Sequence, residues 1–252
     1  MRIVILGSGN VASQLVVVFN QHTKVELVQW YFRDKKKEVK SYRNINIIHE
    51  LDDLEAADIY LFALSDEAIS SVSSHFQNGE LVVHMAGGIA LEALQNNGAK
   101  GVWYPVQSFT SKKTVSMEGL PFAIEGSDQI VVKTLKTLTT LISGKPIEMD
   151  STQRVALHLA AVICNNFTNH LYSQAAALCK SHQIDFKILQ PLIDETTARL
   201  QTGQPKDYQT GPARRGDQKT IEKHLSITEP PLTELYTLLT KTIKKQYGKE
   251  KL

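Results

Sequence analysis

The chain has little net charge and no long apolar run. Its 28 Lys and Arg against 26 Asp and Glu leave a formal net charge of +2 over 252 residues, which does not favour a nucleic acid or a membrane surface as a partner. No apolar stretch approaches the roughly 20 residues that a membrane-spanning helix needs. The charged, strand-like start differs from a signal peptide, so we expect a cytoplasmic protein.

Cysteine is also scarce. Cys164 and Cys179 are the only two, and neither lies near a second Cys-x-x-Cys or a histidine pair. The sequence therefore contains no disulfide framework and no metal-ligand spacing, and we expect no metal cofactor. Both cysteines fall in helical sequence and are expected to be reduced thiols in the core.

What is present is an alternation of apolar runs and helical stretches before residue 150. The apolar runs are 3–6, 25–32, 45–48, 59–64, 81–85, 101–104, 122–125 and 146–149, and the helical stretches are 10–20, 66–75 and 129–142. This alternation predicts an α/β fold, a Rossmann-like doubly wound parallel sheet with helices on both faces.

After Asp150 the pattern becomes entirely helical. The helical stretches are 151–182, 186–201, 218–224 and 231–247, with a Gly/Pro-rich loop before the third. We therefore expect one domain at 1–150 and an all-helical domain at 151–252. Asp150 or Ser151 is placed to cap the long helix, and Asp217 the helix after the loop.

The join between the first strand and the first helix has the form G-x-G-x-x-A. Gly7 permits a tight turn, Gly9 a close approach of the backbone to a ligand, and Ala12 flat packing of the helix on the sheet. Because a helix N-terminus offers N–H groups to an anion, we expect the pyrophosphate of a dinucleotide there. A flavin or S-adenosylmethionine is the alternative. The residues expected to bind the pyrophosphate are Gly7, Ser8, Gly9, Asn10 and Val11.

The end of the second strand bears on the choice of nucleotide. An acid at this place binds the ribose hydroxyls of NAD, whereas a basic residue favours the 2′-phosphate of NADP. Phe32 stands near the place of the acid, followed by Arg33, with Lys35 and Lys36 close behind. An Arg can form two parallel hydrogen bonds to a phosphate, so we expect NADP as the cofactor. Asp34 keeps NAD open, and a solvated basic turn is the structural alternative.

Two further strand ends should face the same ligand, because ligands bind outside the carboxyl ends of parallel strands. A tight strand-to-helix turn is the alternative explanation for the small residues there. The residues expected to line the ribose–nicotinamide half are Ala63, Leu64, Ser65, Met85, Ala86 and Gly87.

The long helix carries an unusual polar sector. At about 100° per residue, Arg154, His158 and Asn165 fall within one narrow sector, and Asn166 lies at the edge of the opposite, apolar face. A half-buried amide there would need hydrogen-bond partners. The sector is either functional or simply exposed to solvent.

Four stretches together resemble a bacterial family of NADP-dependent oxidoreductases that have a Rossmann-like domain and a C-terminal helical domain of unknown function. They are "ILGSGNVA", "DIYLFALSDEAI", "VVHMAGG" with "WYPVQSF", and "TGPARRGD". More distantly, the layout is similar to pyrroline-5-carboxylate reductase, ketopantoate reductase and the β-hydroxyacid dehydrogenases. The resemblance implies a cofactor domain, a helical domain that forms a homodimer, and a cleft for a small-molecule substrate.

The transfer of site residues from this resemblance meets one departure. β-Hydroxyacid dehydrogenases carry K-x-x-N-N, in which the Lys supplies a proton. Here Asn165 and Asn166 match the two amides, but Val162 replaces the Lys and cannot transfer a proton. His158, one turn earlier, is the available general acid, and Tyr104 is a second candidate donor.

Three stretches contribute further candidates for binding the substrate. Besides Asn165, they are Gln107 and Ser108 in "YPVQSF" and Arg214 and Arg215 in "TGPARRGD". The arginines are suited to a carboxylate or phosphate, although a capped loop making a surface or dimer contact explains them equally.

The sequence thus predicts an NADPH-dependent oxidoreductase that reduces a small carbonyl or imine compound, with His158, Asn166 and Tyr104 as catalytic residues. The loss of the Lys weakly favours an imine, which can arrive already protonated. The alternative is a non-catalytic protein that senses NADP or assists assembly.

Overall fold

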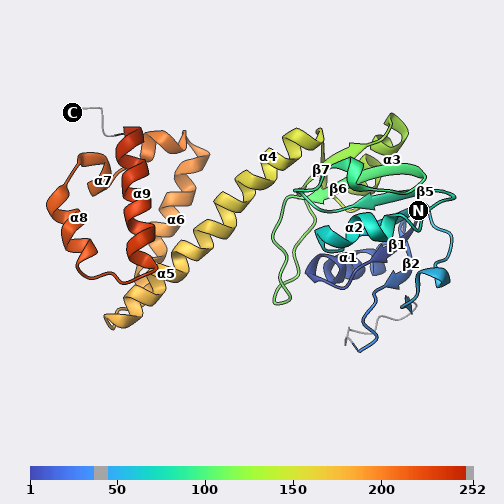
Figure 1. Ribbon diagram of the computed structural model, residues 1–252, viewed down its shortest axis with the longest axis horizontal. Coiled ribbons are helices and arrows are strands. Elements are labelled where there is room, and N and C mark those ends of the chain that lie inside the picture. Colours follow the sequence, from blue (N-terminus) through green and yellow to red (C-terminus); the bar gives the residue numbers. More distant parts are fainter. Residues whose placement is uncertain (37–44, 248–252) are drawn as a thin grey trace. The chain divides into compact units, whose positions relative to one another are not determined.

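The structure is a computed structural model that describes residues 1–36 and 45–247. It divides into two compact units, Met1–Asn165 and Asn166–Leu252 (Figure 1). The first unit extends past residue 150, where the sequence places the domain boundary, and includes the helix that begins at Ser151. The assignment of a cofactor domain and a substrate domain stays a prediction.

The first unit contains an eight-stranded sheet with the order β3-β2-β1-β4-β5-β6-β7-β8. The strands are β1 Arg2–Leu6, β2 Glu26–Tyr31, β3 Asn46–Ile48, β4 Ile59–Phe62, β5 Gly79–His84, β6 Gly98–Pro105, β7 Pro121–Gly126 and β8 Lys145–Glu148. Every strand expected from an apolar run is present, and the Rossmann-like fold is confirmed.

One strand pair corrects the prediction of a parallel sheet. β6 and β7 are antiparallel, whereas the other neighbouring strands are parallel. The reason is the connection: no helix lies between Pro105 and Pro121, and a parallel pair needs a crossover that is usually helical.

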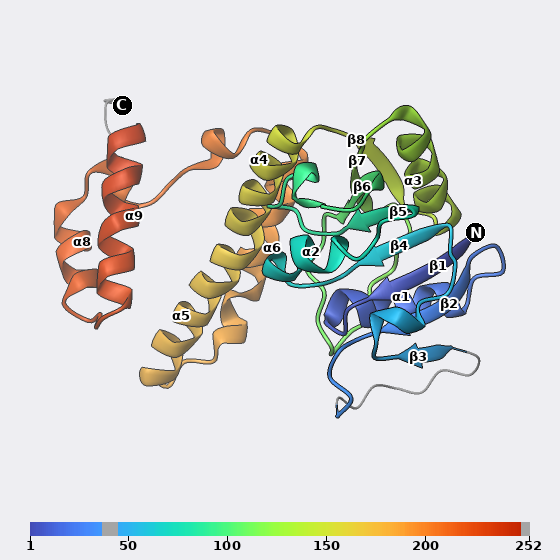
Figure 2. The same cartoon turned by 45° about the vertical axis from the view of Figure 1, so that its right-hand side comes forward.

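Helices cover both faces of the sheet (Figure 2). On one face α1 (Asn10–Asn20) and α3 (Gln129–Leu141) pack on side chains such as Ile3 and Ile5. On the other, α2 (Asp66–Ser73) packs on side chains such as Val4 and Leu6. Successive residues of β1 therefore enter opposite cores, as expected for a strand covered on both sides.

The long helical pattern at 151–182 is not one α-helix. α4 (Ser151–Ala161) passes into a π-helix at Val162–Phe167, and α5 (Thr168–Ser181) follows. Asp150 caps α4 in a capping box with Gln153. Both cysteines are free, but Cys164 is exposed and not in the core as predicted, because the apolar side of this helix is not covered within the single chain.

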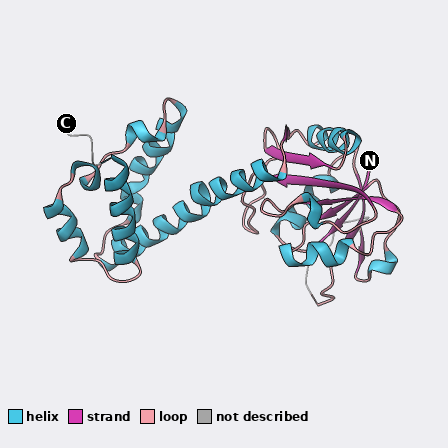
Figure 3. Ribbon diagram, turned by 45° about the horizontal axis from the view of Figure 1, so that its top comes forward, coloured by secondary structure: helices cyan, strands magenta, loops and turns pink. Residues whose placement is uncertain are grey.

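The second unit is helical (Figure 3). It contains α5, α6 Gln190–Ala198, α7 Pro212–Arg215, α8 Gln218–Leu225 and α9 Leu232–Tyr247. Asp217 caps α8 by accepting a hydrogen bond from the N–H of Thr220 at 3.1 Å, as predicted. Within the described residues, no helix has both the length and the apolar character needed to cross a membrane.

Candidate functional site

A groove of about 890 Å³ lies at the carboxyl ends of β1, β4 and β5, entirely within the first unit. This is the edge where ligands bind in doubly wound sheets. It brings together most of the residues singled out in the sequence, namely Gly7, Ser8, Gly9, Asn10, Val11, Arg33, Ala63, Leu64, Ser65, Met85, Ala86, Gly87, Tyr104 and His158.

The glycine turn between β1 and α1 forms the floor of the groove. Gly7 has φ of 125°, and a Cβ there would lie 2.1 Å from the carbonyl oxygen of Ala63, so only glycine fits. A Cβ at Gly9 would meet no atom within 4 Å. Gly9 is also the N-cap of α1, and because glycine has no side chain, no side-chain cap covers the start of this helix. The helix N-terminus therefore faces open space and fits a phosphate.

The end of β2 supplies one cation to the groove. Arg33 lies in the lining beside Tyr31, Phe32 and Asp34 and is the only Arg or Lys in the part of the lining that the structure describes. Lys36 is not part of this lining; its N–H donates to Asp34 Oδ1 at 3.0 Å. Arg33 thus lines the groove and Lys36 does not, and the role of both as partners of a 2′-phosphate stays a prediction.

Helix α2 forms a wall that the sequence prediction missed. Its face presents Ala68, Ser71 and Val72 to the groove, and His75, in the turn after the helix, continues this wall. The signal was available, because these residues follow the spacing of three and four that places side chains on one face of a helix.

The loop between β6 and β7 also contributes to the groove. The side-chain amide of Asn10 donates to the carbonyl oxygen of Phe109 at 3.1 Å, and Phe109 lines the groove. Gln107 and Ser108, the predicted substrate ligands, lie outside the lining and bond to each other, from the N–H of Ser108 to Gln107 Oε1 at 2.8 Å.

At the other end of the groove, Tyr104 on β6 and His158 on α4 form a pair. Tyr104 Oη lies 3.1 Å from His158 Nδ1, and the rings meet edge to face with centroids 5.7 Å apart. Gly87 lies against both: a Cβ there would be 2.7 Å from His158 Nδ1 and 2.7 Å from Tyr104 Cζ. Burial raises the pKa of Tyr104, whose hydroxyl is protonated at neutral pH as in any tyrosine and now stays so to a higher pH.

A buried polar network holds the start of α4. The Arg154 side chain is 0% exposed and donates to the Glu125 carboxylate on β7, to the carbonyl oxygen of Ile89 and to Ser151 Oγ. Ser151 Oγ in turn donates to Glu125 Oε2 at 2.8 Å. Solvent exposure, one of the two explanations for the polar sector, is therefore wrong for Arg154.

The remaining predicted residues are not brought into the groove. Asn165 is exposed, and Asn166 is exposed rather than half-buried as predicted. The count at about 100° per residue fails here because π turns bond residues five apart. Asn166, Arg214 and Arg215 belong to the second unit, where Arg214 donates to the carbonyl oxygen of Gln209. Their roles stay predictions.

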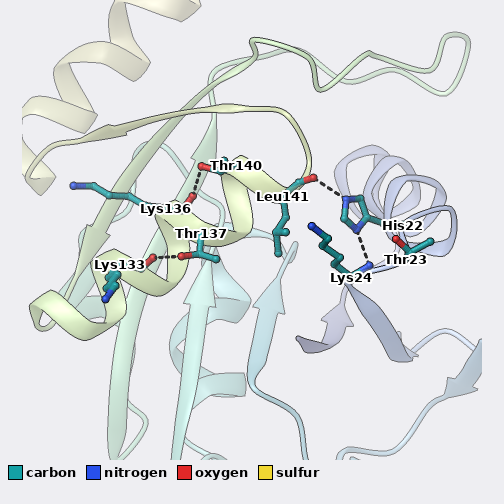
Figure 4. Close-up of a pocket in the computed structure, with 8 residues that line it drawn as sticks. All are labelled: His22, Thr23, Lys24, Lys133, Lys136, Thr137, Thr140 and Leu141. Carbon is teal, nitrogen blue, oxygen red and sulfur yellow. Dashed lines mark hydrogen bonds between the residues drawn. The ribbon is translucent and has the colours of Figure 1, made fainter.

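A second hollow of about 550 Å³ lies between the ends of α1 and α3 (Figure 4). His22 bonds to the carbonyl oxygen of Leu141, and Lys136 pairs with Glu148. Helix C-termini repel anions, and we assign this hollow no ligand. Among the described residues, no group of three or more His, Cys, Asp or Glu is arranged to hold a metal ion.

Comparison with known proteins places these features in a family. Residues 120–243 match a domain of unknown function (DUF2520). The structure is similar to that of a candidate NADP oxidoreductase from Bacteroides fragilis, with 33% sequence identity, a TM-score of 0.86, and 97% of this chain and 98% of that chain covered. A comparison with curated proteins gave no match.

Two more distant structures share the fold. One is 1-pyrroline-5-carboxylate reductase from Streptococcus pyogenes, with 16% identity, a TM-score of 0.61 and 98% of each chain covered. The other is an imine reductase from Myxococcus stipitatus in complex with NADP⁺, with 13% identity, a TM-score of 0.67, and 99% of this chain and 96% of that chain covered.

Proposed function

The chain belongs to the same family as this candidate NADP oxidoreductase of Bacteroides fragilis, and from this premise we propose that it is an NADPH-dependent reductase of a small carbonyl or imine compound. One observation carries the proposal. A single groove has a glycine turn at a helix N-terminus, an arginine at the end of β2, and a tyrosine–histidine pair at its other end. The glycine turn and the arginine can each bind an anionic group, and the tyrosine–histidine pair can donate a proton.

The residues of the groove fit the parts of NADP in order. The N–H groups at the start of α1, beside Gly9, would hold the pyrophosphate. Arg33 would bind the 2′-phosphate through two parallel hydrogen bonds. Met85, Ala86 and Gly87 would lie beside the nicotinamide, which supplies the hydride when NADPH is bound.

The Tyr104–His158 pair would supply the proton in place of the Lys that Val162 replaces. Tyr104 is protonated at neutral pH, as an ordinary tyrosine is, and burial raises its pKa further. It would donate this proton to the carbonyl oxygen of a ketone or to the nitrogen of an imine that arrives unprotonated; an imine that arrives protonated would accept the hydride without this step. His158, in hydrogen-bond contact through Nδ1, would return a proton to the Tyr104 oxygen.

The substrate class is the finer part of the proposal. We favour an imine, since an imine that arrives protonated asks less of a protein acid than a ketone does. An anionic group on the substrate would suit an arginine, and Arg214 and Arg215 stay the predicted candidates. The chain would act in the cytoplasm as a homodimer.

A second candidate function comes from Val162. A family member without the proton-donating Lys of its distant relatives would also serve as an NADP sensor or assembly protein. The sensor would bind NADPH as tightly as an enzyme does, but it would turn over no substrate.

Cofactor titration followed by a turnover screen tests the proposal. By isothermal titration we expect NADPH to bind more tightly than NADH, and Arg33→Ala to weaken NADPH about 10- to 100-fold, as for lost hydrogen bonds to a charged group. Lys35→Ala is the control, since Lys35 pairs with Glu50 outside the groove. An unchanged NADPH affinity in Arg33→Ala would refute the role of this residue.

The turnover screen uses cyclic imines and ketoacids, with NADPH oxidation as the readout. Tyr104→Phe is expected to lower kcat about 100-fold or more while leaving NADPH affinity intact. Tight NADPH binding without any turnover, and no effect of His158→Ala, would favour the sensor. Absence of NADPH binding would refute both.

A further inference from the structure

The network around Arg154 joins three parts of the first unit. Its guanidinium bonds to Glu125 on β7, to Ile89 in the segment after the Gly87–Gly88 turn, and to Ser151 at the start of α4. The N–H of Ser151 donates to Glu125 Oε1 at 3.1 Å, and the N–H of Leu91 donates to Ser151 Oγ at 3.2 Å. The network therefore fixes α4 against both the strand and the turn.

The same three parts carry or contact the proton-donating pair. His158 lies one helical turn after Arg154, so the two side chains share a face of α4. Tyr104 lies on β6, which pairs with β7 so that Val102 is opposite Glu125 and Tyr104 opposite Ala123. Both ends of the Tyr104–His158 hydrogen bond are thus close to a Glu125–Arg154 anchor.

We propose that Arg154 and Glu125 are positioning residues, which set the His158 imidazole against the Tyr104 hydroxyl and the Gly87 turn. The inference rests on the proposed function, because it gives the Tyr104–His158 pair the proton step. Neither Arg154 nor Glu125 lines the groove, so their effect on the chemistry passes through His158.

A purely structural role predicts a different outcome for a paired substitution. Removing one partner of a buried ion pair leaves an uncompensated charge and destabilises a protein, whereas replacing both by apolar residues of similar volume is often neutral. The double variant Arg154→Met/Glu125→Leu therefore keeps the fold but loses the hydrogen bonds to Ile89 and Ser151. If the pair only stabilises the fold, the double variant has the stability and the His158 geometry of the wild type. If the pair positions His158, the double variant has the stability of the wild type but a changed His158 geometry.

The experiment observes His158 directly by NMR of the full chain with labelled histidine, without cofactor or substrate. The variant His158→Gln identifies the His158 resonance. In the double variant, we expect the chemical shifts of the His158 ring to change well beyond those of the control variant, because the ring would leave its hydrogen bond to Tyr104. Lys136→Met/Glu148→Leu is the matched control, an exposed ion pair away from the site, and should leave His158 unchanged.

Two further measurements complete the test. In the turnover assay, kcat of the double variant should fall about tenfold or more with little change in NADPH affinity, as expected for a misplaced catalytic group. Arg154→Lys, which keeps the charge without the planar guanidinium group, should show the same His158 change. It replaces the double variant in the test if the double variant does not fold. Unchanged ring resonances of His158 in a folded variant overturn the positioning role. A wild-type protein without turnover overturns only the proposed function, because the NMR result stands without it.

Discussion

His84 is a buried histidine behind the cofactor groove. It ends β5, is fully buried, and accepts a hydrogen bond at Nδ1 from the N–H of Ala86 at 3.2 Å. Burial first, and then the nearby Arg154 cation, lower its pKa to about 4. The native state therefore holds His84 neutral at physiological pH, and the turn after β5 depends on that neutral acceptor.

This pKa makes the free energy of unfolding depend on pH. In the unfolded chain a histidine binds its proton near pH 6.5, whereas native His84 does so only near pH 4. The stability contribution is thus complete above pH 6.5, and about 3 kcal/mol of it is lost as the pH falls to 4. We expect urea unfolding of His84→Asn, which keeps an acceptor but does not titrate, to show a smaller loss in acid than the wild type. The control is His75→Gln, at an exposed histidine, whose free energy of unfolding should depend on pH as that of the wild type does. If His84→Asn shows this same pH dependence, His84 is not the group responsible for the loss of stability in acid.

Gly87 offers a sharp test of the proton-donating pair. In Gly87→Ala the new methyl group would lie 2.7 Å from His158 Nδ1 and from Tyr104 Cζ, so the two rings must separate. We expect kcat to fall about 100-fold, because small displacements of catalytic groups are costly. The matched control is Gly88→Ala, whose methyl group would lie 3.5 Å from the nearest His158 atom, an ordinary contact. Equal turnover in the two variants would show that the pair does not act in the reaction.

The glycine turn and Arg33 were predictable because their signals are local. A turn that requires glycine and a charged residue after a strand can both be located in a short stretch of sequence. Glu125 and Arg154 were not predictable as partners, since they are 29 residues apart and arginine is almost never fully buried unless it is paired. Their pairing requires the β6–β7 hairpin, which places β7 beside α4.

Helix α3 begins at a side-chain cap. Asp128 accepts hydrogen bonds from the N–H groups of Ile130 and Val131 at 2.8 and 2.9 Å. Its replacement by Ala should cost about 1 kcal/mol and lower the thermal midpoint by about 3 °C for a chain of this size. Ser65→Ala is the control, because Ser65 is the N-cap of α2 but makes no cap hydrogen bond. Calorimetry should give a lower thermal midpoint for the Asp128 variant than for the Ser65 variant. Equal midpoints would show that the Asp128 cap does not stabilise the protein.

The long helix contains a feature that the apolar spacing of its sequence did not predict. Apolar spacing predicted a helix throughout 151–182 but not the π-helix at Val162–Phe167. That stretch contains neither proline nor glycine, so nothing in its local composition marks the change. π-Helices are frequent at functional sites, and this one contains Val162, Asn165 and Asn166, the three positions aligned with the lysine and amides of distant relatives.

For the molecule as a whole, the sequence predicted the eight strands and the helical C-terminal region because both follow from periodic burial. It did not predict which side of α4 faces the sheet. The polar Arg154 is buried while the apolar Leu159 is 58% exposed. Periodicity identifies two faces of a helix but not their partners, and here the inward face is held by an ion pair.

The outward face of α4 and of the π-helix that follows it predicts that the chain associates with a second copy. Val155, Leu159 and Ile163, spaced four residues apart, are 43%, 58% and 51% exposed, and burying each such side chain contributes about 1.5–3 kcal/mol. Light scattering should give twice the 28.1 kDa mass of one chain. Leu159→Asp/Ile163→Asp should give the single mass, because a buried unpaired carboxylate opposes association. Ile130→Asp, at an apolar residue of α3 that is 79% exposed, is the control and should leave the dimer intact. A wild-type protein with the mass of one chain at high concentration would refute the homodimer.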